Sequence, residues 1–240
     1  MEYKESFKLR LDDIDRECNI TNKTILRIFE NIAGYHSDSL GRGVLTMDET
    51  GTTWILLEWK VKVIKRQKYD EEIRVNTWPR SFNKFYTYRD FEIYNEKGEI
   101  CVIGTSKWLL LDIKKSKIAK LDENLINKYG IVDKNVFNQE EVEKIQEPEN
   151  FESEITYKIN RKDIDFNGHV HNLNYLDLAI EALPEKIYLE NNFDDIRITY
   201  KKEIKLGETI KCKYGKVNDK NVVSIFSEDE KIKHAIIELK

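Results

Sequence analysis

Residues 161–175 read RKDIDFNGHVHNLNY, and residues 11–25 read LDDIDRECNITNKTI. A shift of about 150 residues places the Asp-Ile-Asp at 13–15 on the Asp-Ile-Asp at 163–165, and a later asparagine on an asparagine. Similarity at a fixed spacing is typical of a chain built from repeated structural units. The sequence therefore predicts two similar units in tandem.

Each copy continues with the spacing of an amphipathic helix, with apolar residues at i, i+3, i+4 and i+7. These residues are Ile25, Ile28, Phe29 and Ile32 in the first copy, and Tyr175, Leu178, Ala179 and Ala182 in the second. Gly34 and Pro184 follow these stripes, and such residues commonly end helices. We expect one long helix in each unit.

Runs rich in β-branched and aromatic residues follow each helix and predict antiparallel strands. They span 54–64, 73–78, 85–94 and 100–113 in the first copy, and 196–200, 209–214, 222–227 and 232–239 in the second. A sheet wrapped around the helix would bury its apolar stripe. The expected fold class is α+β, with one antiparallel sheet around one long helix in each unit.

The chain between the copies is dense in Lys, Asp, Glu and Asn, and weak helical spacing occurs at 123–129 and 139–145. We expect an N-terminal unit over 1–130, a linker over 131–150 and a C-terminal unit over 151–240.

Composition excludes several classes of function. The 40 basic and 44 acidic side chains are interspersed and give a net charge of -4, which argues against a nucleic-acid partner recognised by a global basic field. No apolar run is long enough for a membrane span, and the charged N-terminus does not resemble a signal peptide. Cys18, Cys101 and Cys212 are widely separated, which disfavours a disulfide framework or a zinc site. A soluble protein of the reducing cytoplasm, without a metal, fits best.

Just before the second helix, a carboxylate, an amide and an imidazole follow one another at alternate positions: Asp165, Asn167 and His169. An extended backbone would turn all three side chains to one side. Unpaired N–H groups at the helix start could then face a developing oxyanion. Structural explanations stay open, because Asp165 or Asn172 could cap the helix and Asn167-Gly168 is a common turn dipeptide. His171, His36 and His234 are more readily explained as structural histidines.

The pattern Asp-x-Asn-x-His-Val-x-Asn-x-x-Tyr, from Asp165 to Tyr175, resembles the acyl-ACP thioesterases of plants and bacteria, which are two fused hotdog units. Residues 200–203, Tyr-Lys-Lys-Glu, resemble the family's Tyr-basic-basic-Glu stretch. In the first half, Thr77-Trp78, Arg89-Asp90, Gly98-Glu99 and the stretch 105–108 resemble its N-terminal signatures. The resemblance spans nearly the whole chain.

This resemblance implies that Asp165, Asn167, His169 and Glu203 form the catalytic set, with no cofactor. Family members often carry a cysteine after the glutamate, but Ile204 stands here, so a covalent cysteine mechanism cannot operate at that position. Water attack with Glu203 as general base remains. The strand pattern alone places Glu203 on a polar, solvated face. The resemblance instead implies that the strand bends or bulges near 201–203 and brings the carboxylate within hydrogen-bonding reach of His169, directly or through one water.

The first copy has Glu17 and Asn19 where the second has Asn167 and His169. We therefore expect a degenerate first unit that binds the acyl chain. Four tryptophans could contribute to its lining, although most aromatics there are expected in the core: Trp54, Trp59, Trp78 and Trp108.

The implied reaction releases a free fatty acid and holo-acyl carrier protein. An acyl-CoA thioesterase of the same fold and a non-catalytic lipid-binding protein remain alternatives. The acidic carrier would dock on exposed basic residues. Two groups are candidates, one formed by Lys60, Lys62, Lys65, Arg66 and Lys68, the other by Lys114, Lys115 and Lys117. The sequence leaves open whether the chain forms a homodimer.

Overall fold

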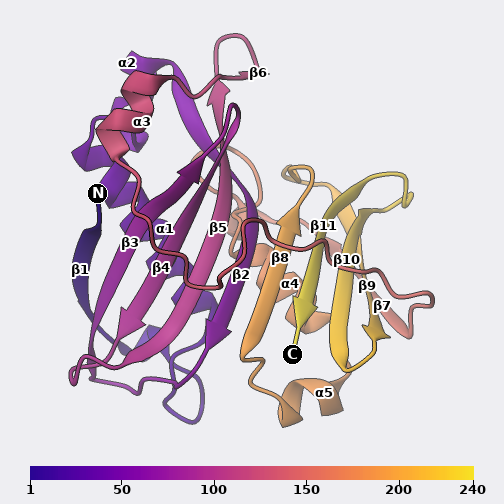
Figure 1. Ribbon diagram of the computed structural model, residues 1–240. Coiled ribbons are helices and arrows are strands. Elements are labelled where there is room, and N and C mark those ends of the chain that lie inside the picture. The colour runs from indigo at the N-terminus through magenta and orange to yellow at the C-terminus, as the bar shows by residue number, and fades with distance from the viewer. The chain divides into compact units, whose positions relative to one another are not determined.

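The computed structural model describes residues 1–240, and the chain divides into two compact units, Met1–Glu141 and Val142–Lys240. In each unit an antiparallel sheet lies against a helix (Figure 1). The residues expected to form a linker are shared between the two units. None of the helices combines the length and apolar character needed to cross a bilayer.

Unit 1 contains five main strands in the order β1-β3-β4-β5-β2, all antiparallel. Its elements are β1 (Tyr3–Lys8), η1 (Leu11–Asp13), α1 (Asn22–Ser39), η2 (Val44–Thr46), α2 (Met47–Thr50), β2 (Thr52–Val63), β3 (Glu72–Phe82), β4 (Tyr86–Tyr94), β5 (Ile100–Asp112), β6 (Lys117–Ile118) and α3 (Glu123–Tyr129). The short β6 pairs with β5.

Unit 2 repeats this topology, with the strand order β7-β9-β10-β11-β8. Its elements are β7 (Ser153–Lys158), η3 (Arg161–Asp163), α4 (Asn174–Glu181), α5 (Glu185–Glu190), β8 (Asp195–Tyr200), β9 (Thr209–Val217), β10 (Lys220–Ser227) and β11 (Lys233–Leu239). The common order confirms the duplication and the expected α+β tandem double hotdog.

The apolar stripe of α1 packs into the core of unit 1. Ile25, Phe29 and Ile32 are fully buried. The ring of Phe29 stacks on Phe91 of β4 with centroids 4.6 Å apart. Gly104 of β5 lies directly under this ring, because a Cβ atom at that position would be 2.5 Å from a Phe29 ring carbon. Removing these side chains from water drives helix and sheet together.

Three helix predictions need correction. Gly34 does not end the first helix, which runs for 18 residues to Ser39. In unit 2 the helix α4 has only 8 residues and is not the long helix expected, although Pro184 does follow its end, at the N-cap of α5. Residues 139–145 form no helix. The helical spacing there is a short solvent-exposed pattern without enough apolar surface to bury.

A cluster of three buried polar side chains, Arg89, His36 and Thr77, lies beside the core of unit 1. The guanidinium of Arg89, on β4, donates to Nδ1 of His36 at 3.0 Å and to the hydroxyl of Thr77 at 3.2 Å. Burial lowers the pKa of Arg89 to about 10. Burial, and then the charge of Arg89, lower the pKa of His36 to about 3, so its imidazole is neutral in the folded chain.

Candidate active site

The segment expected to carry the chemistry folds as a tight turn in unit 2. Ile164 and Val170 form an antiparallel bridge, and within it the N–H of Asp165 donates to the carbonyl of His169 at 2.8 Å. Gly168 has φ +80°, a left-handed conformation that glycine adopts without strain. Asn167-Gly168 is therefore a turn, as the dipeptide predicts. The backbone from 165 to 169 is not extended.

The carboxylate of Asp165 holds this turn together. Its Oδ1 accepts the N–H of Asn167 at 2.8 Å and the N–H of His169 at 3.3 Å. Its Oδ2 accepts a longer hydrogen bond, 3.4 Å, from the side-chain amide of Asn167. Asp165 thus fixes the backbone of both other residues in the predicted set. Asn167 is exposed and His169 is half-buried, so both can reach a bound molecule.

Neither Asp165 nor Asn172 caps the following helix. The N-cap residue of α4 is Leu173, whose side chain makes no capping bond. Nδ1 of His171 accepts the N–H of Leu173 at 3.2 Å. His171 is therefore a structural, hydrogen-bonding histidine, as the sequence suggests.

Glu203 lies in a second turn next to the first. Strand β8 ends at Tyr200, so the expected bend near 201–203 is present. The N–H of Val170 donates to the carbonyl of Ile204 at 2.9 Å, and His169 forms a backbone bridge with Lys205. These bonds bring the chain around Glu203 alongside His169. The Glu203 side chain is exposed, and its carboxylate makes no direct hydrogen bond to the imidazole.

The hydroxyl of Tyr175 lies under the second turn. The sequence placed this residue in the helix stripe and at the end of the motif, without a role in the catalytic set. Tyr175 is buried, and its Oη donates to the carbonyl of Lys202 at 3.5 Å. Burial is the main cause that raises the pKa of Tyr175, and the charges of Glu203, Glu208 and Asp165 raise it further.

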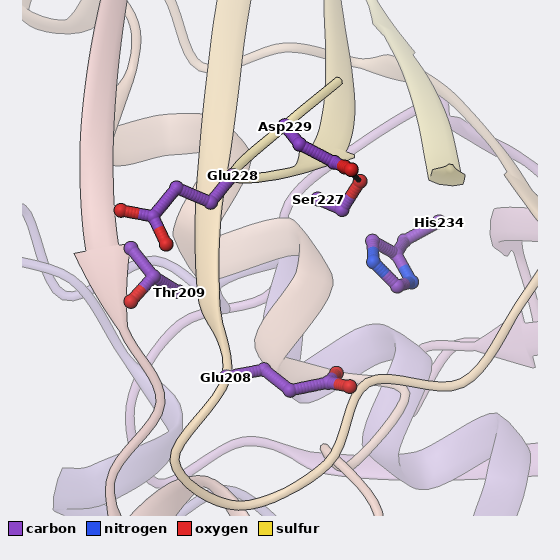
Figure 2. Close-up of a pocket in the computed structure, with 6 residues that line it drawn as sticks. All are labelled: Glu208, Thr209, Ser227, Glu228, Asp229 and His234. Carbon is purple, nitrogen blue, oxygen red and sulfur yellow. Dashed lines mark hydrogen bonds between the residues drawn. The ribbon is translucent and has the colours of Figure 1, made fainter. Parts of the chain in front are cut away.

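An open pocket of about 430 Å³ borders this region of unit 2. Figure 2 shows the residues that line it: Glu208, Thr209, Ser227, Glu228, Asp229 and His234. His234 is buried, with 4% of its surface exposed, and its Nδ1 lies 3.2 Å from the carbonyl of Lys202. Sequence reasoning missed this contact, because nothing in the strand pattern links His234 to a residue so distant in the chain. No group of three or more His, Cys, Asp or Glu side chains is arranged to hold a metal ion.

Unit 1 contains the same turn without the same side chains. Oδ1 of Asp15 accepts the N–H of Glu17 at 2.9 Å and the N–H of Asn19 at 3.0 Å, as Asp165 does in unit 2. Cys18 takes the place of Gly168 and also has a positive φ, +63°. The backbone of the site is thus duplicated, whereas the amide and imidazole occur only in unit 2.

The profile described as the acyl-ACP thioesterase N-terminal domain matches residues 1–129, and that of the C-terminal domain matches residues 145–239. Two hotdog units in tandem, one matched by each profile, define this class of protein. The chain belongs to the acyl-ACP thioesterase family.

Curated relatives include oleoyl-acyl carrier protein thioesterase 1 of Arabidopsis thaliana, which is 22% identical over 227 residues and covers 88% of this chain. Dodecanoyl-[acyl-carrier-protein] hydrolase of Cinnamomum camphora is 21% identical over 222 residues, 87% of this chain. The chain spans 62% and 58% of the lengths of these two relatives.

Solved structures share the fold along the whole chain. An acyl-ACP thioesterase from Bacteroides thetaiotaomicron superposes with a TM-score of 0.83 at 20% identity, covering 99% of this chain and 96% of that one. The 12:0-ACP thioesterase from Umbellularia californica gives a TM-score of 0.87 at 15% identity, covering 100% and 96%.

Proposed function

We propose that this protein hydrolyses fatty acyl thioesters of acyl carrier protein to a free fatty acid and holo-acyl carrier protein. The observation that carries the proposal is the turn in which the carboxylate of Asp165 binds the backbone of both Asn167 and His169. Family membership supports the same reaction.

In this mechanism Glu203 removes a proton from water as the water oxygen attacks the thioester carbonyl carbon. The amide of Asn167 donates to the carbonyl oxygen, which becomes negatively charged in the tetrahedral intermediate. His169, held by Asp165, orients the water and the base. The C–S bond then breaks, and the proton passes to the leaving thiolate of the carrier. General base catalysis of this kind contributes about 10²–10⁴-fold in rate.

The test is hydrolysis of a series of acyl carrier protein thioesters that differ in acyl chain length. Asn167→Ala and His169→Ala should each lower kcat by on the order of 10²-fold, because an oxyanion donor or a polarising group is lost. Glu203→Gln should lower kcat far more than it changes KM. Circular dichroism would confirm that the variants are folded. Wild-type turnover in both alanine variants would remove this turn from the mechanism.

Two alternatives are tested in the same assay. An acyl-CoA thioesterase would hydrolyse acyl-CoA with a higher kcat/KM than the matching acyl carrier protein substrate. A lipid-binding protein would bind the acyl chain and hydrolyse neither substrate. The three cysteines are free, which supports a reducing compartment such as the cytoplasm.

We assign acyl-chain binding to the N-terminal unit, over about residues 1–130, and hydrolysis to the C-terminal unit, over 151–240. Trp59 and Trp78 are completely buried, so they belong to the core. Trp54 and Trp108 are only half-buried and are better placed to contact an acyl chain. A fluorescence change of these tryptophans on adding a fatty acid, lost in Trp54→Phe or Trp108→Phe, tests the assignment.

Carrier docking fits a group of free cations around the two turns of unit 2. These residues, the docking group, are Arg161, Lys162, Lys201, Lys202 and Lys205. All five are exposed, and none makes an ion pair within the chain. By contrast, Lys65 of the first expected group pairs with Glu99, and Lys115 of the second pairs with Asp112. An acidic carrier would therefore find uncompensated positive charge beside the proposed catalytic residues.

The first variant reverses four charges of the docking group by changing Arg161, Lys162, Lys201 and Lys205 to Glu. It should raise KM for acyl carrier protein substrates at least tenfold with little change in kcat. Hydrolysis of an acyl-pantetheine, which lacks the carrier, should be unaffected. Lys114→Glu/Lys117→Glu is the matched control, because both lysines are exposed in unit 1. A larger KM effect in the control variant would place docking there instead.

A further inference from the structure

The carbonyl oxygen of Lys202, directly before Glu203, accepts hydrogen bonds from two side chains. Oη of Tyr175, on α4, donates at 3.5 Å, and Nδ1 of His234, on β11, lies at 3.2 Å. A carbonyl oxygen only accepts, so Nδ1 of His234 carries the proton. Both donors are buried, with 3% and 4% of their surfaces exposed. Packing therefore holds them in place.

The backbone of this turn also rests on His234. Strand β11 has a β-bulge against β10, in which His234 is the extra residue. The N–H groups of Lys201 and Lys202 both donate to the carbonyl of His234, at 2.8 Å and 3.2 Å. A bulge redirects the chain that pairs with it. The bulge at His234 therefore sets where β8 ends. It also sets the direction in which the Glu203 side chain leaves the backbone.

Unit 1 builds the same turn by other means. Cys101 is the bulge residue of β5, and its carbonyl accepts the N–H groups of Ile64 and Lys65 at 2.8 Å and 3.0 Å. The carbonyl of Lys65, which corresponds to that of Lys202, accepts the side-chain amide of Gln67 at 3.0 Å. In unit 1 the acceptor is therefore satisfied by Gln67, a residue of the turn itself, and not by side chains from the helix or the bulge.

The comparison separates what the fold needs from what the site needs. Unit 1 has Ile25 in place of Tyr175 and Cys101 in place of His234, and an arginine stands in place of Glu203. The turn therefore forms without a tyrosine on the helix or a histidine at the bulge. Unit 2 contains both donors, and it is the unit that carries Glu203.

We propose that Tyr175 and His234 are positioning residues for the general base. Their side chains hold the Lys202 carbonyl from two directions, one from the helix and one from the sheet, and so fix the peptide from which Glu203 projects. The inference rests on the proposed function, in which Glu203 activates water. Preorganisation of this kind affects the transition state more than substrate binding.

The first experiment compares His234→Asn with His234→Gln. In Asn the side-chain amide nitrogen is the same number of bonds from Cα as Nδ1 is in His, so it can donate from the same place. In Gln the amide nitrogen is one bond farther from Cα. His234→Asn should keep most of the wild-type kcat, and His234→Gln and Tyr175→Phe should each lower kcat about tenfold with KM within about twofold. Cys101→Ala, at the matching bulge of unit 1, is the control and should leave kcat unchanged.

The second experiment tests whether the two residues act through Glu203. In a Glu203→Gln background, Tyr175→Phe and His234→Gln should cause no further loss of kcat, because the base that they position is gone. Hydrogen exchange of a peptide covering 200–206 should be faster in His234→Gln than in His234→Asn. The matching peptide 63–69 of unit 1 is an internal reference and should not change.

Each failure has its own signature. If Glu203→Gln is impaired but Tyr175→Phe and His234→Gln are as active as wild type, positioning is wrong and the proposed function stands. Additive losses in the Glu203→Gln background also contradict the proposal. If wild-type protein hydrolyses no acyl thioester, or Glu203→Gln is fully active, the proposed mechanism fails, and the positioning role with it.

Discussion

At the scale of single residues, the side chains around Asp165 are those that the sequence grouped, but the sequence did not decide the backbone conformation that brings them together. The pattern indicated that Asp165, Asn167 and His169 act together, and Asp165 does bind the backbone of the other two. The geometry that brings them together is a turn around Gly168 rather than an extended strand. Alternation along a strand applies only to extended backbone, whereas the Asn167-Gly168 dipeptide indicated a turn, and the sequence alone could not decide between the two.

Glu203 and its neighbours mark the limit of prediction at this scale. The strand pattern placed Glu203 in solvent, and its side chain is exposed. The contacts of Tyr175 and His234 with Lys202 join residues far apart in the chain. The helix stripe predicted that Tyr175 is buried, but the bulge at His234 and the carbonyl that both side chains contact have no local sequence signal.

The cysteines should be dispensable for hydrolysis. Burial raises the pKa of Cys212 to about 12 and also raises that of Cys101, so neither thiol forms a thiolate near neutral pH. Cys18 is exposed, but it lies in the turn of unit 1. Iodoacetamide should modify Cys18 in the folded protein and leave kcat unchanged. Loss of hydrolysis on blocking one thiol would contradict the water mechanism.

At the scale of elements, the strands were predicted more closely than the helices. The expected strand over 100–113 is β5, Ile100–Asp112, and the one over 232–239 is β11, Lys233–Leu239. Long β-branched runs bounded by turn residues give strong local signals. Helix ends depend on tertiary packing, which carries α1 beyond Gly34 because residues such as His36 are buried after it.

Two glycines in unit 1 should respond in opposite ways to the same change. Gly104→Ala adds a Cβ atom 2.5 Å from the ring of Phe29 and should lower the free energy of unfolding by about 1–3 kcal/mol. Gly34→Ala adds a methyl group inside α1 with no atom within 4 Å, and should raise it by up to about 1 kcal/mol. Urea unfolding of both variants checks the pair, and equal effects would rule out the contact with Phe29 as the cause.

At the scale of the whole molecule, the duplication was the most reliable prediction. Both sheets have the same strand order, and both turns have the same aspartate hydrogen bonds. The sequence also identified the family on motifs that lie in both halves. It could not show which cations are free for a carrier, because ion pairs such as Lys8 with Asp70 depend on the folded arrangement.

Stability of the folded chain should fall with acid through His36. Its pKa is about 3 in the folded chain and close to 6.5 when unfolded, so between these values only the unfolded chain binds the proton. The contribution of His36 to the free energy of unfolding is therefore fully present above pH 6.5. It is lost progressively as the pH falls toward 3. At pH 4.5 the loss is on the order of 2–3 kcal/mol.

His36→Asn keeps an acceptor for Arg89 but does not titrate. Its Tm should therefore fall less than that of wild type between pH 7 and pH 4.5, in thermal melts followed by circular dichroism. Other groups contribute equally to both proteins, so the difference isolates His36. Parallel Tm curves would show that His36 binds its proton equally in the folded and unfolded chains, so that its pKa is not lowered by folding.

The turn of unit 1 has a consequence for how this chain can drift in sequence. The carboxylate of Asp15 closes it together with backbone hydrogen bonds, and no side chain at position 17 or 19 takes part in these bonds. The side chains at 17 and 19 are therefore free of the constraint that the fold imposes on Asp15. Random change can accumulate at those two positions while Asp15 is preserved, and a library of substitutions should recover many folded variants at 17 and 19 but few at 15.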